Sequence, residues 1–169
     1  MHLKTLLAAL LLTPAVASAS QIPNGDFELN NGTSYWSVTS TTGHSVISNM
    51  PGLNNAAYLG GFDNEVTSIS QTVTELDYDM TDLIWEHNIT SNEPCGPEYD
   101  MAWVVAHTPS SGWQYTEIEL CNPGGIQLFW TAGVLPISGN AHETLTILVV
   151  SQTDVSVPST IVFDNFETQ

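Results

Sequence analysis

The sequence S-T-I-V-F-D-N-F-E at residues 159–167 decides the fold. It is a β-branched and aromatic run that becomes acidic at Asp164, which is typical of a strand with one buried side. Near the other end of the chain stands a similar string, N-G-D-F-E, at residues 24–28. We expect the two strings to meet across one sheet and to hold a hard cation between their acidic side chains.

From residue 21 onward, short runs of this kind alternate with clusters of turn residues, such as P-S-S-G at 109–112. Alternation with a period of two indicates strands, because Ile69, Gln71 and Val73 would share one face of their run. The regular spacing predicts an all-β fold, either a sandwich or a barrel. The expected strands are 22–29, 35–39, 44–47, 57–59, 66–73, 83–90, 100–107, 114–120, 126–131, 143–151 and 160–167.

Residues 1–19 are expected to be a signal peptide. They contain an apolar core at 6–12 and end in A-S-A, the small-x-small pattern after which a signal peptidase cuts. The apolar core is shorter than the ~20 residues that a transmembrane helix needs. We therefore expect a secreted, extracellular protein without membrane insertion, in which residues 20–169 form a single domain.

The charge of the chain is one-sided. Lys4 is the only Lys or Arg in the sequence, against 18 Asp and Glu. Such a surface repels nucleic acid and anionic membranes and attracts divalent cations, so nucleic acid is not an expected partner. Solubility alone is a second explanation of the acidity.

Cys95 and Cys121 are the only cysteines. In an exported protein an isolated pair is most simply a disulfide. Neither cysteine has a C-x-x-C partner or a basic neighbour, so we expect neither a redox nor a nucleophilic role.

Several motifs resemble those of a known family. N-G-D-F-E at 24–28, followed by Trp36, resembles the opening of galactose-binding-like jelly-roll modules, which include carbohydrate-binding domains appended to secreted bacterial enzymes. A-Y-L-G-G-F-D-N-E-V-T-S-I-S-Q-T-V at 57–73 is similar to a subgroup that accompanies secreted peptidases. The resemblance covers nearly all of residues 20–169 and implies an antiparallel β-sandwich of the jelly-roll type. Further matching segments are D-L-I-W-E-H at 82–87, C-G-P-E-Y-D at 95–100 and T-D-V-S-V-P-S-T-I-V-F-D-N-F at 153–166.

The resemblance also implies a structural calcium ion between the first and the last strand. Calcium takes six to eight hard oxygen ligands from carboxylates and carbonyls. By position, Glu28 and Asp164 are the matching side chains, with Asp26 close by. Asp63 and Glu65 are further candidates, because the Gly-Gly pair before them lets the backbone bend around an ion. The alternative is that these acids are turn-forming or exposed residues.

Two aromatic residues are candidates for sugar contact. Trp113 and Tyr115 follow a Ser-Ser-Gly turn, where an exposed ring could stack on a sugar. Tyr99, close to Cys95, is a third candidate ligand-binding residue. Other aromatic residues alternate with apolar neighbours and are expected in the core; they are Trp36, Tyr58, Trp85, Trp103 and Trp130.

No catalytic motif is present. The sequence has no histidine spacing typical of zinc sites and no G-x-S-x-G nucleophile motif. A carboxylate pair of the glycosidase type stays open, because the separation of two acids is not readable from sequence. We expect no enzymatic activity. Asn31 and Asn88 begin N-glycosylation sequons.

Two hypotheses follow for the function. The first is a secreted, non-catalytic, calcium-supported module that binds extracellular polysaccharide or a cell-surface glycan. The alternative is a structural protein that assembles with itself into a filament or matrix through sheet edges and bridging divalent cations.

Overall fold

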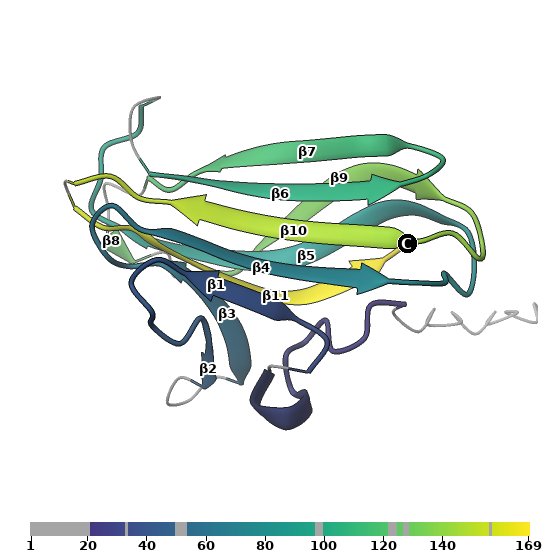
Figure 1. Cartoon of the computed structure of the whole chain (residues 1–169). Helices are drawn as coiled ribbons and strands as arrows, with labels where there is room; N and C mark the ends of the chain where they lie inside the picture. The colour runs from purple at the N-terminus through teal and green to yellow at the C-terminus, as the bar shows by residue number, and fades with distance from the viewer. Residues whose placement is uncertain are drawn as a thin grey trace, which may run out of the picture.

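Two antiparallel sheets face each other in a sandwich (Figure 1). Sheet A has the strand order β1-β4-β10-β6-β7, and sheet B has the order β2-β3-β11-β5-β8, with β9 also paired to β5. This computed structural model describes residues 21–32, 34–49, 54–96, 100–121, 125–126, 129–155 and 157–169. The expected signal peptide and Tyr99 therefore lie outside the described residues. None of the helical segments in these ranges has the length and apolar character needed to cross a membrane.

A four-residue 3₁₀ helix, η1 (Leu29–Gly32), precedes the strands. The strands are β1 (Ser37–Ser40), β2 (Ile47–Asn49), β3 (Asn55–Gly60), β4 (Val66–Val73), β5 (Met80–Ser91), β6 (Met101–Thr108), β7 (Gly112–Glu119), β8 (Gly125–Ile126), β9 (Thr131–Gly139), β10 (Leu145–Gln152) and β11 (Thr160–Thr168).

The core lies between the inner faces of the two sheets. Ile69 of β4 and Ile147 of β10 point inward from sheet A, and Leu83 of β5 and Phe163 of β11 point inward from sheet B; all four are fully buried. Each such side chain contributes about 1.5–3 kcal/mol relative to an exposed position. The all-β fold expected from the alternation is therefore confirmed, and of the two alternatives, sandwich or barrel, it is the antiparallel sandwich that the family resemblance implies.

Strand β11 contains residues 160–167 of the acidic, aromatic segment 159–167, and it lies inside sheet B between β3 and β5. Its pairing with β5 is interrupted by a bulge between Asp164 and Glu167. Inside this bulge, Asn165 has a left-handed backbone with φ 53°. The bulge aims Phe166 into the core, where its ring lies 5.4 Å from that of Trp36.

The N-terminal string 24–28 meets this bulge, but it does not form the expected strand. Asn24 and Phe27 have left-handed backbones with φ 54° and 56°, so the chain turns repeatedly here instead of extending. Gly25 is the point of contact, because its carbonyl accepts a hydrogen bond of 3.0 Å from the backbone N–H of Phe166. The two strings thus adjoin through a turn packed on a strand.

Replacing Gly25 with alanine is expected to destabilise this junction. A Cβ at this position would lie 2.1 Å from the backbone carbonyl oxygen of Phe166, and a backbone atom cannot move aside as a flexible side chain can. Overpacking of this kind costs about 1–3 kcal/mol. The free energy of unfolding in urea measures the loss. Ser37→Ala, at an exposed position of β1, is the control; an equal loss in both variants would show that the close approach of Gly25 to Phe166 is not the cause.

The prediction of a strand at 126–131 is also wrong. The structure has the short β8 at Gly125–Ile126 and a separate strand, β9, which begins at Thr131. Strand β9 contains Gly133 and Pro136, and both residue types are unfavourable inside strands, so the sequence did not indicate a strand at these positions. The missing side chain of Gly133 leaves a space that the Trp85 ring fills. An atom of that ring lies 2.1 Å from the position that a Cβ at residue 133 would take, and this packing stabilises β9.

Candidate functional site

The outer face of sheet A carries three aromatic side chains on two neighbouring strands. In β6, Ala102, Val104 and Ala106 point into the core, so the alternate residue Trp103 points outward. In β7, Trp113 and Tyr115 are 62% and 65% exposed.

Backbone pairing sets these residues side by side. Trp113 is opposite His107, Tyr115 is opposite Val105, and Glu117 is opposite Trp103. Residues two apart on one strand lie about 6.6–6.8 Å apart, so the rings follow one another along β7. We call the outward-facing surface of β6, β7 and β10 the aromatic face; it comprises Trp103, Val105, His107, Trp113, Tyr115, Glu117, Leu148 and Val150.

Direct contacts fix the orientation of two of the rings. The indole Nε1 of Trp103 donates a hydrogen bond of 3.3 Å to Oε1 of Glu117. The ring centroids of His107 and Trp113 lie 4.7 Å apart. The aromatic face therefore combines partly fixed apolar rings with a carboxylate acceptor, a combination suited to a ligand with both C–H and O–H groups.

The expected core placement is right for Trp36 and Trp85 and wrong for Trp103 and Trp130, whereas Tyr58 is buried in a separate cluster with Ala56 and Val162. Trp103 is half-buried on the aromatic face, and Trp130 is 37% exposed. Strand β6 has apolar residues on both faces, so alternation alone did not show which set would be inside. The small residues Ala102 and Ala106 occupy the core.

A groove of about 530 Å³ lies on sheet B, along β5, β9 and the end of β11. Its lining includes the apolar Ala132 and Val134 and the polar Glu86, Asn165 and Glu167. Nδ2 of Asn165 donates a hydrogen bond of 2.9 Å to Oε2 of Glu86. The groove is thus an acidic concavity on a different sheet from the aromatic face.

Asp164 stands among other carboxylates beside this groove. Burial raises the pKa of Asp164 to about 6, and the hydrogen bond from the backbone N–H of Asn165 opposes that rise. The negative charges of Glu28, Asp26 and Glu86 raise this pKa further. Asp164 also contributes to the raised pKa of Tyr58, after burial of the tyrosine itself. The arrangement brings Asp26, Glu28 and Asp164 into one electrostatic environment without a basic side chain.

This donor set fits a calcium ion in its chemistry. Carboxylate oxygens are ligands that calcium prefers. Asp164 is half-buried among negatively charged side chains, and a bound ion would neutralise their charges. Glu28 is engaged already, since its Oε1 accepts a hydrogen bond of 2.8 Å from the backbone N–H of Asn55. Asp26 Oδ1 lies 3.3 Å from the backbone N of Glu28. The oxygens of these three carboxylates do not all lie within 4.8 Å of one another, so the side chains would have to draw together to hold an ion, with backbone carbonyls as further ligands.

Asp63 and Glu65 do not join that environment. Asp63 is exposed in the turn after β3. Glu65 is fully buried at the start of β4, where Ser40, Thr42 and His44 surround its Oε1. The structure therefore separates the two groups of candidate calcium ligands.

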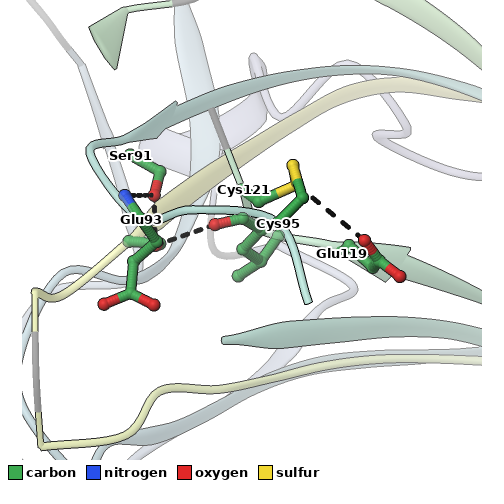
Figure 2. Close-up of a disulfide and its surroundings, with 7 residues drawn as sticks. Ser91, Glu93, Cys95, Glu119 and Cys121 are labelled. Atoms are coloured by element: carbon green, nitrogen blue, oxygen red, sulfur yellow. Dashed lines mark hydrogen bonds between the residues drawn. A yellow bond between two sulfur atoms is a disulfide. The ribbon is translucent and has the colours of Figure 1, made fainter. Parts of the chain in front are cut away.

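A disulfide joins Cys95 to Cys121 across 26 positions of sequence. Figure 2 shows it beside Glu119, at the end of β7, with Ser91 and Glu93 of the neighbouring segment nearby. Among the described residues, Cys95, Glu119 and Cys121 are the one group of three potential metal ligands whose atoms all lie within 4.8 Å of one another. Both sulfurs are bonded in the disulfide, so this group is a covalent crosslink and not a metal centre.

The two sequons lie in different settings. The backbone of Asn31 belongs to η1, and Thr33 of that sequon lies outside the described residues. Asn88 lies on β5, half-buried, and its Nδ2 donates a hydrogen bond of 3.2 Å to the carbonyl of Phe129.

Asp164→Asn is expected to stabilise the protein above pH 6 in EDTA. The folded pKa of about 6 is raised above the ordinary value of 3.8, so this group contributes stability that is fully present below about pH 4 and is lost as the pH rises through about 6. An amide keeps the acceptor for the Asn165 N–H and carries no charge. Discounted for solvent screening at this half-exposed site, the gain at pH 8 is roughly 1 kcal/mol.

Urea unfolding between pH 3 and pH 8 measures this difference. The variant and the wild type should converge toward pH 3, below the ordinary pKa of 3.8, where Asp164 is mostly protonated in both states of the chain. If Asp164→Asn is less stable than the wild type at pH 8 in EDTA, the charge of Asp164 does not destabilise the folded protein, and the prediction is wrong. Asp79→Asn, at an exposed position, provides a matched control.

Comparison with known proteins places the fold among carbohydrate-binding modules. No protein-family model and no curated protein sequence matches the chain. The solved structure of TmCBM61 in complex with β-1,4-galactotriose has a TM-score of 0.65 at 14% identity, over 90% of this chain and 99% of that one.

Two further solved structures have the same architecture. CBM28, a carbohydrate-binding module specific for non-crystalline cellulose, has a TM-score of 0.52 at 8% identity and covers 83% of this chain and 90% of its own. A structure described for the promiscuous specificity of carbohydrate-binding modules of the β-sandwich superfamily has a TM-score of 0.52 at 13% identity, over 83% and 59% of the two chains. The chain therefore has the same β-sandwich fold as these carbohydrate-binding modules, the jelly-roll type that its sequence resemblance implies.

Proposed function

We propose that this protein is a secreted, non-catalytic module that binds a polysaccharide or cell-surface glycan on the aromatic face. The observation that carries the proposal is the placement of Trp103, Trp113 and Tyr115 on one outward surface at adjoining pairing positions. Monomeric soluble proteins rarely expose a large continuous apolar surface without a binding role. The aromatic rings would stack on the C–H faces of sugar rings, and Glu117 and His107 would meet hydroxyl groups.

The negative charge of the chain favours an uncharged glycan as the ligand. Glu117 and Glu119 of β7 both face outward, and no Lys or Arg follows Lys4 in the sequence. A uronic or sulfated polysaccharide would find no cationic side chain and would be repelled by the net negative charge. Carboxylates serve an uncharged sugar well, because they accept hydrogen bonds from hydroxyl groups.

The inference that the protein is not a glycosidase rests on the arrangement of its carboxyl groups. Asp164, whose pKa is raised to about 6, lies on β11 in sheet B, whereas the aromatic face belongs to sheet A. A glycosidase places a raised-pKa acid across the scissile bond from a second carboxylate. The ring-lined face and the perturbed acid are therefore on different sheets.

Isothermal titration against a panel of soluble polysaccharides tests the proposal. The panel should contain uncharged β-galactans and β-glucans and, for comparison, an alginate and a sulfated galactan. Binding to at least one uncharged glycan, with no binding to the two anionic ones, is the expected result. Binding only to anionic glycans, or release of reducing sugar during the titration, would overturn it.

Calcium is proposed as a structural ion at Asp26, Glu28 and Asp164. It would neutralise the charges that raise the pKa of Asp164 and would hold the turn at 24–28 to β11. A ligand that binds only the folded state raises its stability, by about 2.7 kcal/mol at a hundredfold excess over Kd. Millimolar calcium should therefore raise the melting temperature of the wild type and leave that of Asp164→Asn nearly unchanged. Equal shifts in both proteins would contradict this assignment.

Self-assembly is the second candidate function, and the edges of sheet A favour it. Strand β7 is eight residues long and, among the strands that the structure describes, pairs with β6 alone. Such an edge can add a strand from a second copy. Light scattering of the processed protein, first in EDTA and then in millimolar calcium, should show growth to large species if this function holds. A mass of one subunit in both conditions would exclude it.

A further inference from the structure

Side chains of the β1–β2 connection surround a buried carboxylate at the opposite edge of sheet A from β7. Glu65, immediately before β4, is fully buried. Its Oε1 lies 2.8 Å from Ser40 Oγ, 2.5 Å from Thr42 Oγ1 and 2.8 Å from His44 Nδ1. Ser40, Thr42 and His44 stand at alternate positions in S-T-T-G-H, and all three converge on this oxygen.

The three surrounding atoms are also close to one another. Ser40 Oγ lies 3.2 Å from Thr42 Oγ1 and 3.1 Å from His44 Nδ1, and Thr42 Oγ1 lies 3.1 Å from the same nitrogen. All six separations among the four atoms therefore fall between 2.5 and 3.2 Å. Four atoms related in this way occupy the corners of a small tetrahedron.

Hydrogen bonds do not account for the whole cluster. The two hydroxyl groups and Nδ1 supply three protons at most, so three of the six contacts have no proton to share. The second oxygen of Glu65, Oε2, is buried and has no hydrogen-bond partner among the described residues. A buried carboxylate with one crowded oxygen and one bare oxygen is costly. A cation at the centre would contact all four atoms and neutralise the carboxylate.

We propose that Ser40, Thr42, His44 and Glu65 form a binding site for a small divalent transition metal of the zinc type. Zinc is four-coordinate at about 2.0–2.2 Å from nitrogen and oxygen ligands, which places tetrahedral ligands about 3.3–3.6 Å apart. The cluster therefore has to open by roughly half an ångström to admit the ion. Calcium needs six to eight oxygens at about 2.3–2.6 Å and is too large for it.

The surroundings provide both access and rigidity. The His44 side chain is 19% exposed, so that an ion can enter from solvent beside the imidazole, and the Phe62 ring covers that imidazole at 5.1 Å. The backbone of Glu65 is fixed, because its N–H donates to Thr153 Oγ1 at 2.9 Å and its carbonyl accepts from Thr153 N at 2.9 Å. The ion would therefore fasten the β1–β2 connection to the start of β4, independently of glycan binding.

Cobalt substitution tests this site on the intact, processed protein. After treatment with EDTA and dialysis, Co²⁺ is added as a spectroscopic probe, and Zn²⁺, Ca²⁺ and Mg²⁺ are compared in thermal denaturation. We expect the visible absorption of four-coordinate Co²⁺, its displacement by Zn²⁺, and a rise in melting temperature of roughly 5–10 °C at a hundredfold excess of Zn²⁺ over Kd. Ca²⁺ and Mg²⁺ should not displace the cobalt.

Two variants locate the signal. His44→Gln should abolish the cobalt spectrum, whereas His142→Gln, at an exposed histidine, should keep it. If His44→Gln fails to fold, Thr42→Val serves in its place, because it removes a single oxygen, and metal affinity should fall at least tenfold. An octahedral cobalt spectrum, no spectrum at all, or an unchanged spectrum in the folded His44→Gln or Thr42→Val variant would overturn the proposal.

Discussion

Trp113→Ala is expected to weaken binding of an uncharged polysaccharide by roughly thirtyfold. Trp113 is 62% exposed and lies against the His107 ring, so its indole is already oriented before a sugar arrives. A tryptophan that anchors a binding surface contributes about 2 kcal/mol or more to binding, and every 1.4 kcal/mol corresponds to a factor of ten. Titration calorimetry with the glycan that the wild type binds measures the change.

The control for this substitution is Phe129→Ala. Phe129 is 78% exposed and lies before β9, beside Asn88 of sheet B, so its removal deletes a comparable apolar ring away from the aromatic face. Its affinity for the glycan should equal that of the wild type. Similar losses in Trp113→Ala and Phe129→Ala would show that the contact is non-specific, and no loss in Trp113→Ala would move the site away from the aromatic face.

Removal of the disulfide in a Cys95→Ser, Cys121→Ser variant is expected to cost about 3.5 kcal/mol of unfolding free energy. The estimate follows from the loop of 26 positions that the bond closes, whose freedom in the unfolded chain the crosslink restricts. The bond also ties the segment after β5 to the end of β7 (Figure 2). Urea denaturation of the double variant measures the loss.

Reduction of the wild type with dithiothreitol should reproduce the loss, and the same reagent should leave the double variant unchanged. Glycan affinity of the folded double variant should remain within a few fold of the wild type, because no ring of the aromatic face is removed. A loss below about 1 kcal/mol would indicate that the unfolded chain is already restricted around these positions.

The sequence predicts most of this fold because most strands have one buried face. Where alternation was clear, as at 66–73, the expected and observed strand agree. The turn at 24–28 could not be anticipated as such, since its apolar Phe27 is buried from a left-handed backbone and not from a strand. Strand β9 was hidden by its glycine and proline, and its stability comes from contact with Trp85, which is remote in sequence.

The candidate site was predictable in part for the same reason. Trp113 and Tyr115 follow a turn signal, and alternation with Glu117 marks β7 as a strand with a solvent face. Trp103 was not recognised, because only the packing of the opposite sheet decides which face of an apolar strand is inside. The cluster at Glu65 joins residues 21–25 positions apart in the chain, and no spacing rule links them.

Titration of the isotope-labelled protein with the bound glycan, followed through its five tryptophan indole N–H signals, distinguishes the aromatic face from the groove of sheet B. If the aromatic face binds the glycan, the signals of Trp103 and Trp113 shift with a common saturation curve. Those of Trp36 and Trp85, which are buried in the core, and of Trp130 should stay in place. Shifts confined to Trp85 and Trp130, with Trp103 and Trp113 unchanged, would place the ligand in the groove of sheet B and contradict the assignment to the aromatic face.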